Sequence, residues 1–505
     1  MDPEVDHTER KSLELRPSLT PLIVGLIIAL AAVVTRLAPF GDPVAHVDDQ
    51  FYLLSGHAIL QGDWPYVDIW DRKPVGLFLI YAGIAALGGA HSVAATHIIA
   101  GLFAAATALT IARIAERFAT RWGGMLAGIA YLVCLPFFGG QTGQSPVFYN
   151  LLMGLAGLLL FQAAETEDHR AIVRKAMLAM LLCGLSMTIK QVTFIEGAYF
   201  GLAFLILGHR ARIGSARLVA MALAMLVIAL APTAAALGVY QMTGRGEAFI
   251  FANFISIFLK NPVGGSSLSL GIVHLAKFLP PILVIGLWDY LPRAGAPLSL
   301  DRRLLLGWIF AASVGYLFVP YFFDHYALPL LVPLSIAGAS VYSRRRGYVW
   351  LIGLTFLSIA FGHLFSFAKH AKRAATFNQL AEVTSRELHG GCLYVATGHT
   401  QLYTATGACR VTPFVFPDHL TTNAEVGATG VDSIAELRRI FAQRPAVVTT
   451  TIAKVELRNP AAETLIMNEL RAHYRPVPWP KSPTPNKLSQ IIIWSRIVRA
   501  PVPAN

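Results

Sequence analysis

Ionisable residues gather near the start of the chain, in HVDDQFYLLSGHAILQGDWPYVDIWDRKP, residues 46–74. Asp48 and Asp49 begin this stretch, and Asp71, Arg72 and Lys73 end it. A carboxylate can take a proton from a hydroxyl group, and a fixed cation can stabilise a phosphate that leaves as a bond breaks. These residue types together indicate a site for group transfer to a hydroxyl.

The composition places this site in a membrane protein. Of the 505 residues 55% are hydrophobic and only 14% are charged, with a mean hydropathy of +0.56, which excludes a soluble domain of this length. The net charge of +12 does not indicate nucleic acid, because membrane proteins concentrate basic residues in their cytoplasmic loops. The lipid bilayer is therefore the first partner that we expect.

Apolar segments predict eleven membrane crossings. They lie near 19–39, 91–112, 123–138, 146–164, 176–190, 192–208, 218–240, 271–288, 304–320, 326–342 and 348–367. The first has no small-residue cleavage pattern behind it and is expected to remain as a helix. The apolar stretch 74–89 is too short to span and is expected to lie at the interface.

With these crossings, the basic residues of the connections fall on one side of the membrane, which the positive-inside rule makes the cytoplasm. They are Arg113, Arg117, Arg121, Arg170, Arg174, Lys175, Arg210, Arg212, Arg217, Arg302, Arg303, Arg344, Arg345 and Arg346. Residues 1–18 are then cytoplasmic, and 46–74, 139–145, 241–270, 321–325 and the chain after 368 face outward. The unusual polar residues lie at the outer ends of the spans, so the site is expected at the outer surface of an inner membrane.

A change of composition near residue 368 predicts a second domain. Strand patterns at 392–396, 446–451 and 490–494 alternate with helical patterns at 432–443 and 464–474, which favours a small α/β domain with a largely parallel sheet. The domain has no glycine-rich phosphate loop. Cys392 and Cys409 flank two strand-like runs and could form a disulfide in an oxidising compartment, whereas Cys134 and Cys183 are expected to pack within spans.

Several motifs resemble one family. DDQFY followed by LLSGHAILQGDWPYVDIWDRKPVGLFLIY, residues 48–81, resembles the first outward loop of polytopic glycosyltransferases of the GT-C type, the protein O-mannosyltransferase and aminoarabinose transferase superfamily. GLSMTIKQVTF and PYFFDHYALPLLVPLSIAG resemble two of its spans, and LYVATGHTQLYTATG with FVFPDHL resembles the outward domain of its bacterial members. The family's acidic pair is commonly Asp-Glu, whereas this chain has Asp-Asp, which leaves the role of Asp49 less defined.

The resemblance implies a fold of about eleven spans with interfacial helices and a C-terminal α/β soluble domain: residues 1–18, a transmembrane domain 19–367 with its catalytic loop at 40–90, and an outward domain 368–505. It implies transfer of a sugar from a polyprenyl-phosphate donor to a hydroxyl on a glycan, lipid or protein, with neither a metal nor a cofactor. The implied catalytic residues are Asp48, as base, and Asp49. The implied phosphate-binding residues are Lys190, Arg245, Arg72 and Lys73, and the implied substrate-binding residues are Gln191, His325, Tyr326, Asp71 and Tyr52.

Each of these residues also has a structural alternative. Lys190 could extend along the membrane surface, His325 could cap a helix, and Arg245 could pair with Glu247. Segment 246–262 could border the path of the lipid donor or only rest on the membrane. Further residues that could either bind the sugar or serve the fold are Trp64, Tyr66, Trp70, Gln141 and Gln144.

Two other functions remain open on the sequence. A transporter or flippase of lipid-linked glycans would need ionisable residues distributed through its spans to both faces, whereas here they gather outward. A membrane-anchored binding domain would leave the acidic first loop without a role. Mutation of Asp48 distinguishes these functions, because only an enzyme should lose turnover while it keeps its fold and its lipid binding.

Overall fold

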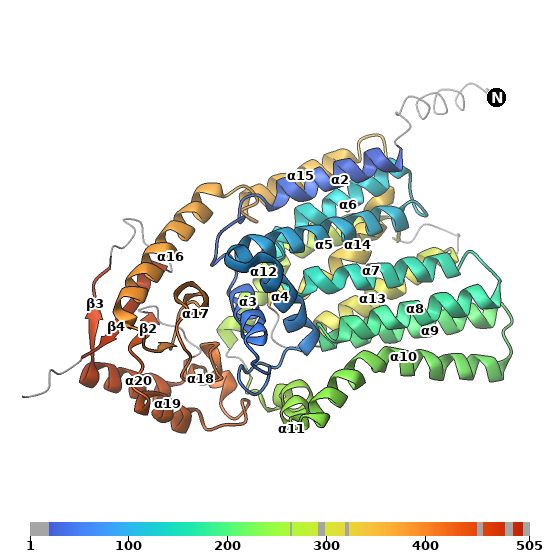
Figure 1. Cartoon of the computed structure of the whole chain (residues 1–505). Coiled ribbons are helices and arrows are strands. Elements are labelled where there is room, and N and C mark those ends of the chain that lie inside the picture. Colours follow the sequence, from blue (N-terminus) through green and yellow to red (C-terminus); the bar gives the residue numbers. More distant parts are fainter. Residues whose placement is uncertain are drawn as a thin grey trace, which may run out of the picture.

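The computed structural model describes residues 20–262, 265–290, 298–318, 323–451, 458–479 and 488–497. The predicted cytoplasmic segment 1–18 and part of the predicted outward connection 321–325 lie outside these residues. Figure 1 shows a bundle of long helices on one side, a smaller domain with a sheet on the other, and α3 and α4 between them.

The membrane part is helical throughout. Its helices are α2 (Pro21–Arg36), α3 (Val47–Leu60), α4 (Val75–Gly88), α5 (Ser92–Ala115), α6 (Arg121–Cys134), α7 (Ser145–Ala163), α8 (His169–Met187), α9 (Phe194–Arg210), α10 (Ser215–Met242), α11 (Gly246–Ile250), α12 (Gly265–Leu287), α13 (Leu300–Leu317), α14 (Leu331–Tyr342) and α15 (Tyr348–Ala360). Short helical turns extend several of them: η2 (Leu135–Phe138), η3 (Gln191–Thr193) and η7 (Asp324–Leu330).

Each of the eleven predicted crossings overlaps one of these helices, and the chain is a polytopic helical membrane protein. Among the described residues, six helical segments are both long and apolar enough to span: Val75–Ala115, Arg121–Phe138, Ser145–Ala163, Gln191–Arg210, Ser215–Met242 and Asp324–Tyr342. The number eleven stays a prediction. Within the first segment, α4 has 14 residues, roughly 21 Å of helix, and ends at Gly89, whose φ is +49°. Because a span needs about 30 Å, α4 alone is too short to cross, as the sequence predicted.

The basic connections meet at one end of the bundle. Arg117, after α5, donates hydrogen bonds of 3.2 and 3.1 Å to Asp301, in the first turn of α13, and also pairs with Glu165, after α7. Arg344, after α14, donates a 2.5 Å hydrogen bond to Asp289, after α12. These contacts confirm that the basic connections share one side, while the identity of that side as the cytoplasm stays a prediction.

The C-terminal part begins with α16 (Phe367–Leu388) and contains β1 (Leu393–Val395), α17 (Gln401–Thr406), α18 (Asp418–Thr421), α19 (Ser433–Ala442), β2 (Val447–Thr451), α20 (Pro460–His473), β3 (Tyr474–Val477) and β4 (Ile491–Arg496). The three predicted strands and both predicted helices are confirmed. Cys392 and Cys409 form a disulfide, and Cys134 and Cys183 are buried free thiols.

The expectation of a largely parallel sheet is wrong. The strand order is β1-β2-β4-β3, and only β1 and β2 are parallel. β3 and β4 are consecutive and pair antiparallel, and β4 lies between β2 and β3. The sequence prediction missed β3 because the helical pattern of α20 runs directly into it and because Pro476 argues against a strand. Pro476 is tolerated because β3 is an edge strand.

The two parts of the chain share a packed boundary. Trp70, from the loop between α3 and α4, lies in the core of the C-terminal part, 5.4 Å from the ring of Phe414 and 4.7 Å from that of His419. Its backbone N–H donates to the carbonyl of Pro413 at 3.0 Å. The loop that carries the candidate catalytic residues is therefore held from both sides.

Candidate active site

The start of α3 positions the acidic pair. His46 is the N-cap residue, and its Nδ1 accepts a 3.2 Å hydrogen bond from the N–H of Asp48. Asp48 and Asp49 thus occupy the first helical turn, where the helix dipole favours negative charge. Adjacent helical residues point about 100° apart, so the two carboxylates face different surroundings.

Asp48 faces a cluster of polar and basic side chains. Its Oδ2 accepts a 3.0 Å hydrogen bond from Nε2 of Gln144, a fully buried residue. Burial would raise the pKa of Asp48, but His46, Lys73 and His325 beside it outweigh that effect, so the pKa lies below its usual value. The ring of His325 lies 6.2 Å from that of His46. Asp48 is therefore ionised and surrounded by groups that favour its negative charge.

Asp49 faces a different side of the helix from Asp48. Its Oδ2 accepts a 2.9 Å hydrogen bond from the N–H of Gly143, and the carbonyl of Gly143 accepts one of 2.7 Å from the hydroxyl of Tyr81. A Cβ at Gly143 would lie 2.2 Å from that hydroxyl, so this close approach requires glycine. Burial raises the pKa of Asp49.

The connection between α6 and α7 carries Gln144 to Asp48. Arg36 of α2 is buried, and its guanidinium donates to the carbonyls of Gly140 at 3.0 Å and Thr142 at 2.8 Å. This arginine fixes the connection from α2. Of the two glutamines that the sequence left open, Gln144 contacts Asp48, whereas Gln141 donates to the carbonyl of Gly362 at 3.0 Å.

Two lysines lie beside Asp48. Burial would lower the pKa of Lys73, but Asp71 and Asp48 raise it above its usual value. Lys190 stands between α8 and η3, with its Nζ 4.5 Å from the ring centre of Tyr326. Burial, with Lys73 next to it, lowers the pKa of Lys190 well below the usual value. An anion that enters this cluster would therefore favour the protonated form of Lys190.

A pocket opens below Lys190. It has an empty volume of about 410 Å³, its open mouth included, and lies between α7, η3 with α9, α13 and η7. Its exposed surface is mostly apolar, and Val192, Ala312, Gly315 and Pro329 are among the residues that line it. Further lining residues are Lys190, Tyr326, Tyr149, Thr193, Glu196 and Tyr316. A cation, Lys190, thus lines a mostly apolar space.

The two predicted arginines have partners within the protein. Arg72 forms a bidentate ion pair with Glu425 of the C-terminal part. The guanidinium of Arg245 lies 4.5 Å from the ring centre of Trp64 and donates to the carbonyl of Thr243. The structure thus brings Lys190 and Lys73 to Asp48, and gives both arginines other contacts.

The remaining predicted residues mainly support the loop. Asp71 accepts hydrogen bonds from the backbone N–H groups of Arg72 at 2.5 Å and Lys73 at 3.0 Å, and Gln191 donates to the carbonyl of Arg72 at 3.3 Å. Tyr52 is buried against Tyr81, with ring centres 5.4 Å apart. These contacts fix the backbone that presents Lys73. Tyr66 and Trp70 are buried, and Trp64 packs on Tyr240, so packing accounts for all three aromatic residues.

The C-terminal part adds residues that the sequence did not indicate. Phe416 packs on Phe51 with ring centres 5.5 Å apart, and His419 packs on Trp70. Asp418, beside them, is exposed. The chain around it still desolvates the carboxylate, and Glu425 and Asp48 add to this effect, so its pKa is raised to about 6, which Lys260 and Arg458 oppose. The sequence contains no signal for this carboxylate, because the motif FVFPDHL has no catalytic pattern. Its position near Asp48 depends on the packing of the C-terminal part against the helical bundle.

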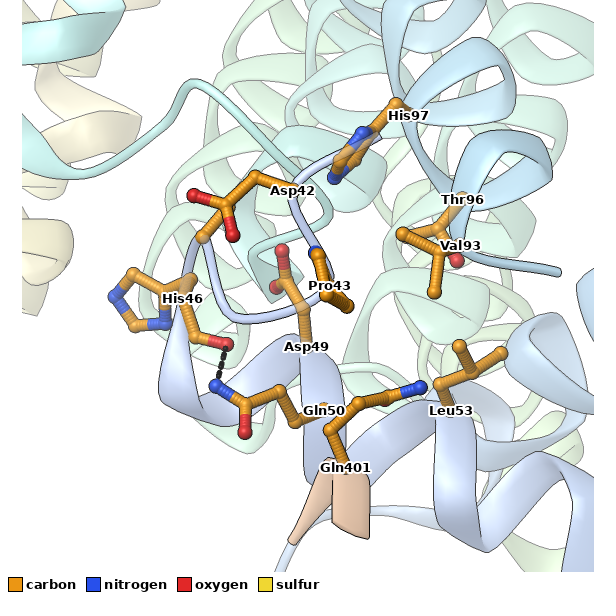
Figure 2. Close-up of a pocket in the computed structure, with 11 residues that line it drawn as sticks. Asp42, Pro43, His46, Asp49, Gln50, Leu53, Val93, Thr96, His97 and Gln401 are labelled. Atoms are coloured by element: carbon orange, nitrogen blue, oxygen red, sulfur yellow. Dashed lines mark hydrogen bonds between the residues drawn. The ribbon is translucent and has the colours of Figure 1, made fainter. Parts of the chain in front are cut away.

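A second pocket lies behind Asp49, on the face of α3 away from Lys73. Figure 2 shows Asp49, Gln401 and Pro43 around it, with His97 and Thr96 from α5. Its empty volume is about 240 Å³, its open side included. Among the described residues, Oδ1 of Asp49 and Oε1 of Gln401 are buried without a hydrogen-bond partner. The part of the chain that the structure describes contains no group of three His, Cys, Asp or Glu side chains suited to a metal.

No protein-family model and no sequence of a curated protein matches the chain. Among solved structures, ArnT from Cupriavidus metallidurans bound to undecaprenyl phosphate is similar over 94% of this chain and 97% of its own, with a TM-score of 0.60 and 12% identity. The chain has the fold of ArnT. ArnT in the apo state gives a TM-score of 0.59 at 13% identity, with the same coverage of both chains. The S. cerevisiae protein O-mannosyltransferase Pmt1-Pmt2 complex bound to the sugar donor matches 48% of this chain and 36% of its own, with a TM-score of 0.37 and 16% identity.

The ArnT likeness confirms the predicted architecture of a polytopic helical membrane protein. At this level of identity it shows the fold and assigns no role to a residue. The roles of Asp48, Lys73, Lys190 and the other predicted site residues stay predictions.

Proposed function

We propose that the protein is a membrane glycosyltransferase that moves a sugar from a polyprenyl-phosphate carrier to an acceptor hydroxyl on a glycan, lipid or protein. The observation that carries this proposal is the position of Lys190, which lines a mostly apolar pocket and lies near Lys73 and Asp48. A lipid phosphate has the matching chemistry, an anion joined to an apolar chain. The bound lipid of the ArnT structure, undecaprenyl phosphate, has this chemistry too.

In the proposed reaction, the acceptor oxygen forms a bond to the anomeric carbon as the bond from that carbon to the phosphate oxygen breaks. Asp48 takes the proton of the acceptor hydroxyl, and its negative charge stabilises the cationic anomeric carbon. The polyprenyl phosphate leaves with the bonding electrons, and Lys190 and Lys73 stabilise its growing charge. One base without a covalent intermediate inverts the anomeric centre.

Donor binding would also strengthen the base. The pKa of Asp48 is lowered by His46, Lys73 and His325, against the effect of burial. A phosphate beside Lys73 partly neutralises that cation, so the pKa of Asp48 rises and the carboxylate accepts a proton more readily. The site therefore becomes reactive when the donor is present.

The proposed location is the outer face of an inner membrane, with the N-terminus in the cytoplasm and the C-terminal part in the periplasm. The basic connections lie at one end of the bundle and the site lies at the other. The disulfide between Cys392 and Cys409 supports an oxidising compartment for the C-terminal part. The sugar-phosphate bond drives the transfer, so the reaction as written uses no nucleotide or metal.

The experiment that tests this function compares a deletion strain with strains complemented by the wild type, Asp48→Asn or Asp68→Asn. Asp68 is a matched control from the same loop, where its carboxylate accepts a 2.8 Å hydrogen bond from the N–H of Trp64. Mass spectrometry would follow surface glycans and the pool of polyprenyl-phosphate sugars. We expect the deletion and Asp48→Asn strains to lose one mass increment and to accumulate the corresponding lipid-linked sugar. A wild-type glycan profile in the Asp48→Asn strain would contradict the proposal.

A further inference from the structure

We propose that Glu425 of the C-terminal part is a positioning residue of the donor site. It holds Arg72 and Lys260 next to Lys73 and Lys190. The phosphate site is therefore complete only when the C-terminal part packs against the helical bundle. This inference rests on the proposed function. It makes the active site a joint product of the two parts of the chain.

The contacts of Glu425 are short and buried. Its Oε1 accepts 3.0 Å and 2.9 Å hydrogen bonds from Arg72 and Lys260, and its Oε2 accepts a 2.5 Å hydrogen bond from Arg72. The residue is 5% exposed. The two cations come from distant segments, the first outward loop and the turn after η5 (Ser256–Leu259). A single carboxylate therefore joins three segments of the chain.

The backbone around Glu425 is fixed to the segment that carries Lys260. The hydroxyl of Ser256 donates to the carbonyl of Ala428 at 2.6 Å and accepts from Nε of Arg72 at 3.2 Å. The N–H of Asn261 donates to the carbonyl of Ala424 at 3.0 Å. Segments 251–261 and 423–430 thus form one boundary, and this boundary sets the position of the carboxylate.

Electrostatics explains why these cations need a carboxylate. Burial lowers the pKa of Lys190, and the nearby charges of Lys73 and Lys260 lower it further. Burial also lowers the pKa of Lys260, while Glu425 opposes that effect. Burial would raise the pKa of Glu425, but Arg72 and then His419 and Lys260 lower it to about 2, so the carboxylate stays ionised. Without its charge, the mutually repelling cations would move apart or lose protons.

The ion pair leaves binding capacity on the arginine. A guanidinium has five N–H groups, and the contacts of Arg72 with Ser256 and Glu425 engage three of them. The other two can bond a phosphate oxygen while Glu425 stays in place. Glu425 therefore orients the guanidinium of Arg72 and does not compete with the phosphate for it. We expect phosphate binding to weaken when the carboxylate of Glu425 is removed.

The test measures binding of undecaprenyl phosphate to the purified full chain in detergent, for the wild type, Glu425→Gln, Glu425→Asp, Lys260→Met and the double variant Glu425→Gln with Lys260→Met. Glu436→Gln is the matched control, since Glu436 pairs with Arg439 within the C-terminal part. We expect Glu425→Gln to weaken binding about tenfold or more, with partial recovery in Glu425→Asp and no change in Glu436→Gln. In the Lys260→Met background, Glu425→Gln should weaken binding by a smaller factor than in the wild type, because Glu425 acts on the phosphate site through Lys260.

The outcomes separate this inference from the proposed function. If the wild type binds undecaprenyl phosphate and Glu425→Gln binds within twofold of it or more tightly, the positioning role is wrong and the function stands. Additive losses in the double variant would show a purely structural role and also overturn the inference. If the wild type does not bind the lipid phosphate, the proposed donor is wrong and the inference falls with it.

Discussion

The adjacent carboxylates Asp48 and Asp49 should differ sharply in their effect on turnover. They are neighbours in the chain but have different contacts: Asp48 faces Gln144 and Lys73, and Asp49 accepts from the N–H of Gly143 and lines the second pocket. Only Asp48 lies where a phosphate leaving group and an acceptor could meet. Asp48→Asn and Asp49→Asn make the same chemical change at positions one residue apart.

The size of each effect follows from these contacts. Loss of a general base costs roughly 10²- to 10⁴-fold in rate, which is about 3 to 5 kcal/mol of barrier. Asparagine at position 48 keeps the size of the side chain and leaves Lys73 and Lys190 in place, so donor binding should persist. Asparagine at position 49 still offers an oxygen to the N–H of Gly143, so its cost should stay below about tenfold.

The assay uses the purified protein with polyprenyl-phosphate sugars extracted from the deletion strain, and follows transfer to an envelope extract in a single turnover. Binding of undecaprenyl phosphate by the same preparations would confirm that each variant is folded. The reasoning would be refuted if Asp49→Asn lost as much rate as Asp48→Asn, or if Asp48→Asn kept more than about a tenth of the wild-type rate. Either result would move the base away from Asp48.

Three further predictions concern binding and stability. Lys190→Gln should raise the Kd for undecaprenyl phosphate about tenfold or more. Lys175→Gln, which changes a lysine of a basic connection, should leave the Kd unchanged. Equal Kd values for the two variants would show that Lys190 does not bind the phosphate. Because the raised pKa of Asp418 disfavours its ionised form in the folded state, Asp418→Asn should melt at a slightly higher temperature than the wild type at pH 8. The difference is small because this residue is exposed, and it should disappear by about pH 3, below both pKa values; a difference that grows as the pH falls would contradict this sign. Gly56→Ala should lower the melting temperature because a Cβ there would lie 2.4 Å from a backbone oxygen of α4, whereas Gly83→Ala, with nothing within 4 Å, should not lower it; equal melting temperatures would contradict this packing argument.

Part of the candidate site follows directly from local sequence. Asp48 and Asp49 begin a helix after His46, and the polar stretch that follows closes the loop at Lys73. Lys190 ends one apolar segment and precedes the next. Because a span fixes the depth of its terminal residues, the order of spans already gathers these side chains at one face.

Other contacts were outside the reach of sequence reasoning. Arg72 was predicted to bind phosphate, and its guanidinium pairs with Glu425, 353 residues later in the chain. Arg245 was also predicted to bind phosphate, and its guanidinium lies over the ring of Trp64. A cation has no local signal that tells a phosphate partner from a carboxylate partner, since both satisfy the same N–H groups.

The sequence by itself determined the membrane class, the helical segments, the common side of the basic connections and the position of the acidic pair. These features depend on hydropathy and short-range periodicity, which each segment carries within itself. The tertiary structure decided the antiparallel insertion of β4, the pairing of Arg72 and Lys260 with Glu425, and the position of Asp418 near Glu425 and Asp48. The insertion of β4 depends on strand pairing within the C-terminal part. The other two features depend on contacts between segments far apart in the chain, which form only when the helical bundle and the C-terminal part pack against each other.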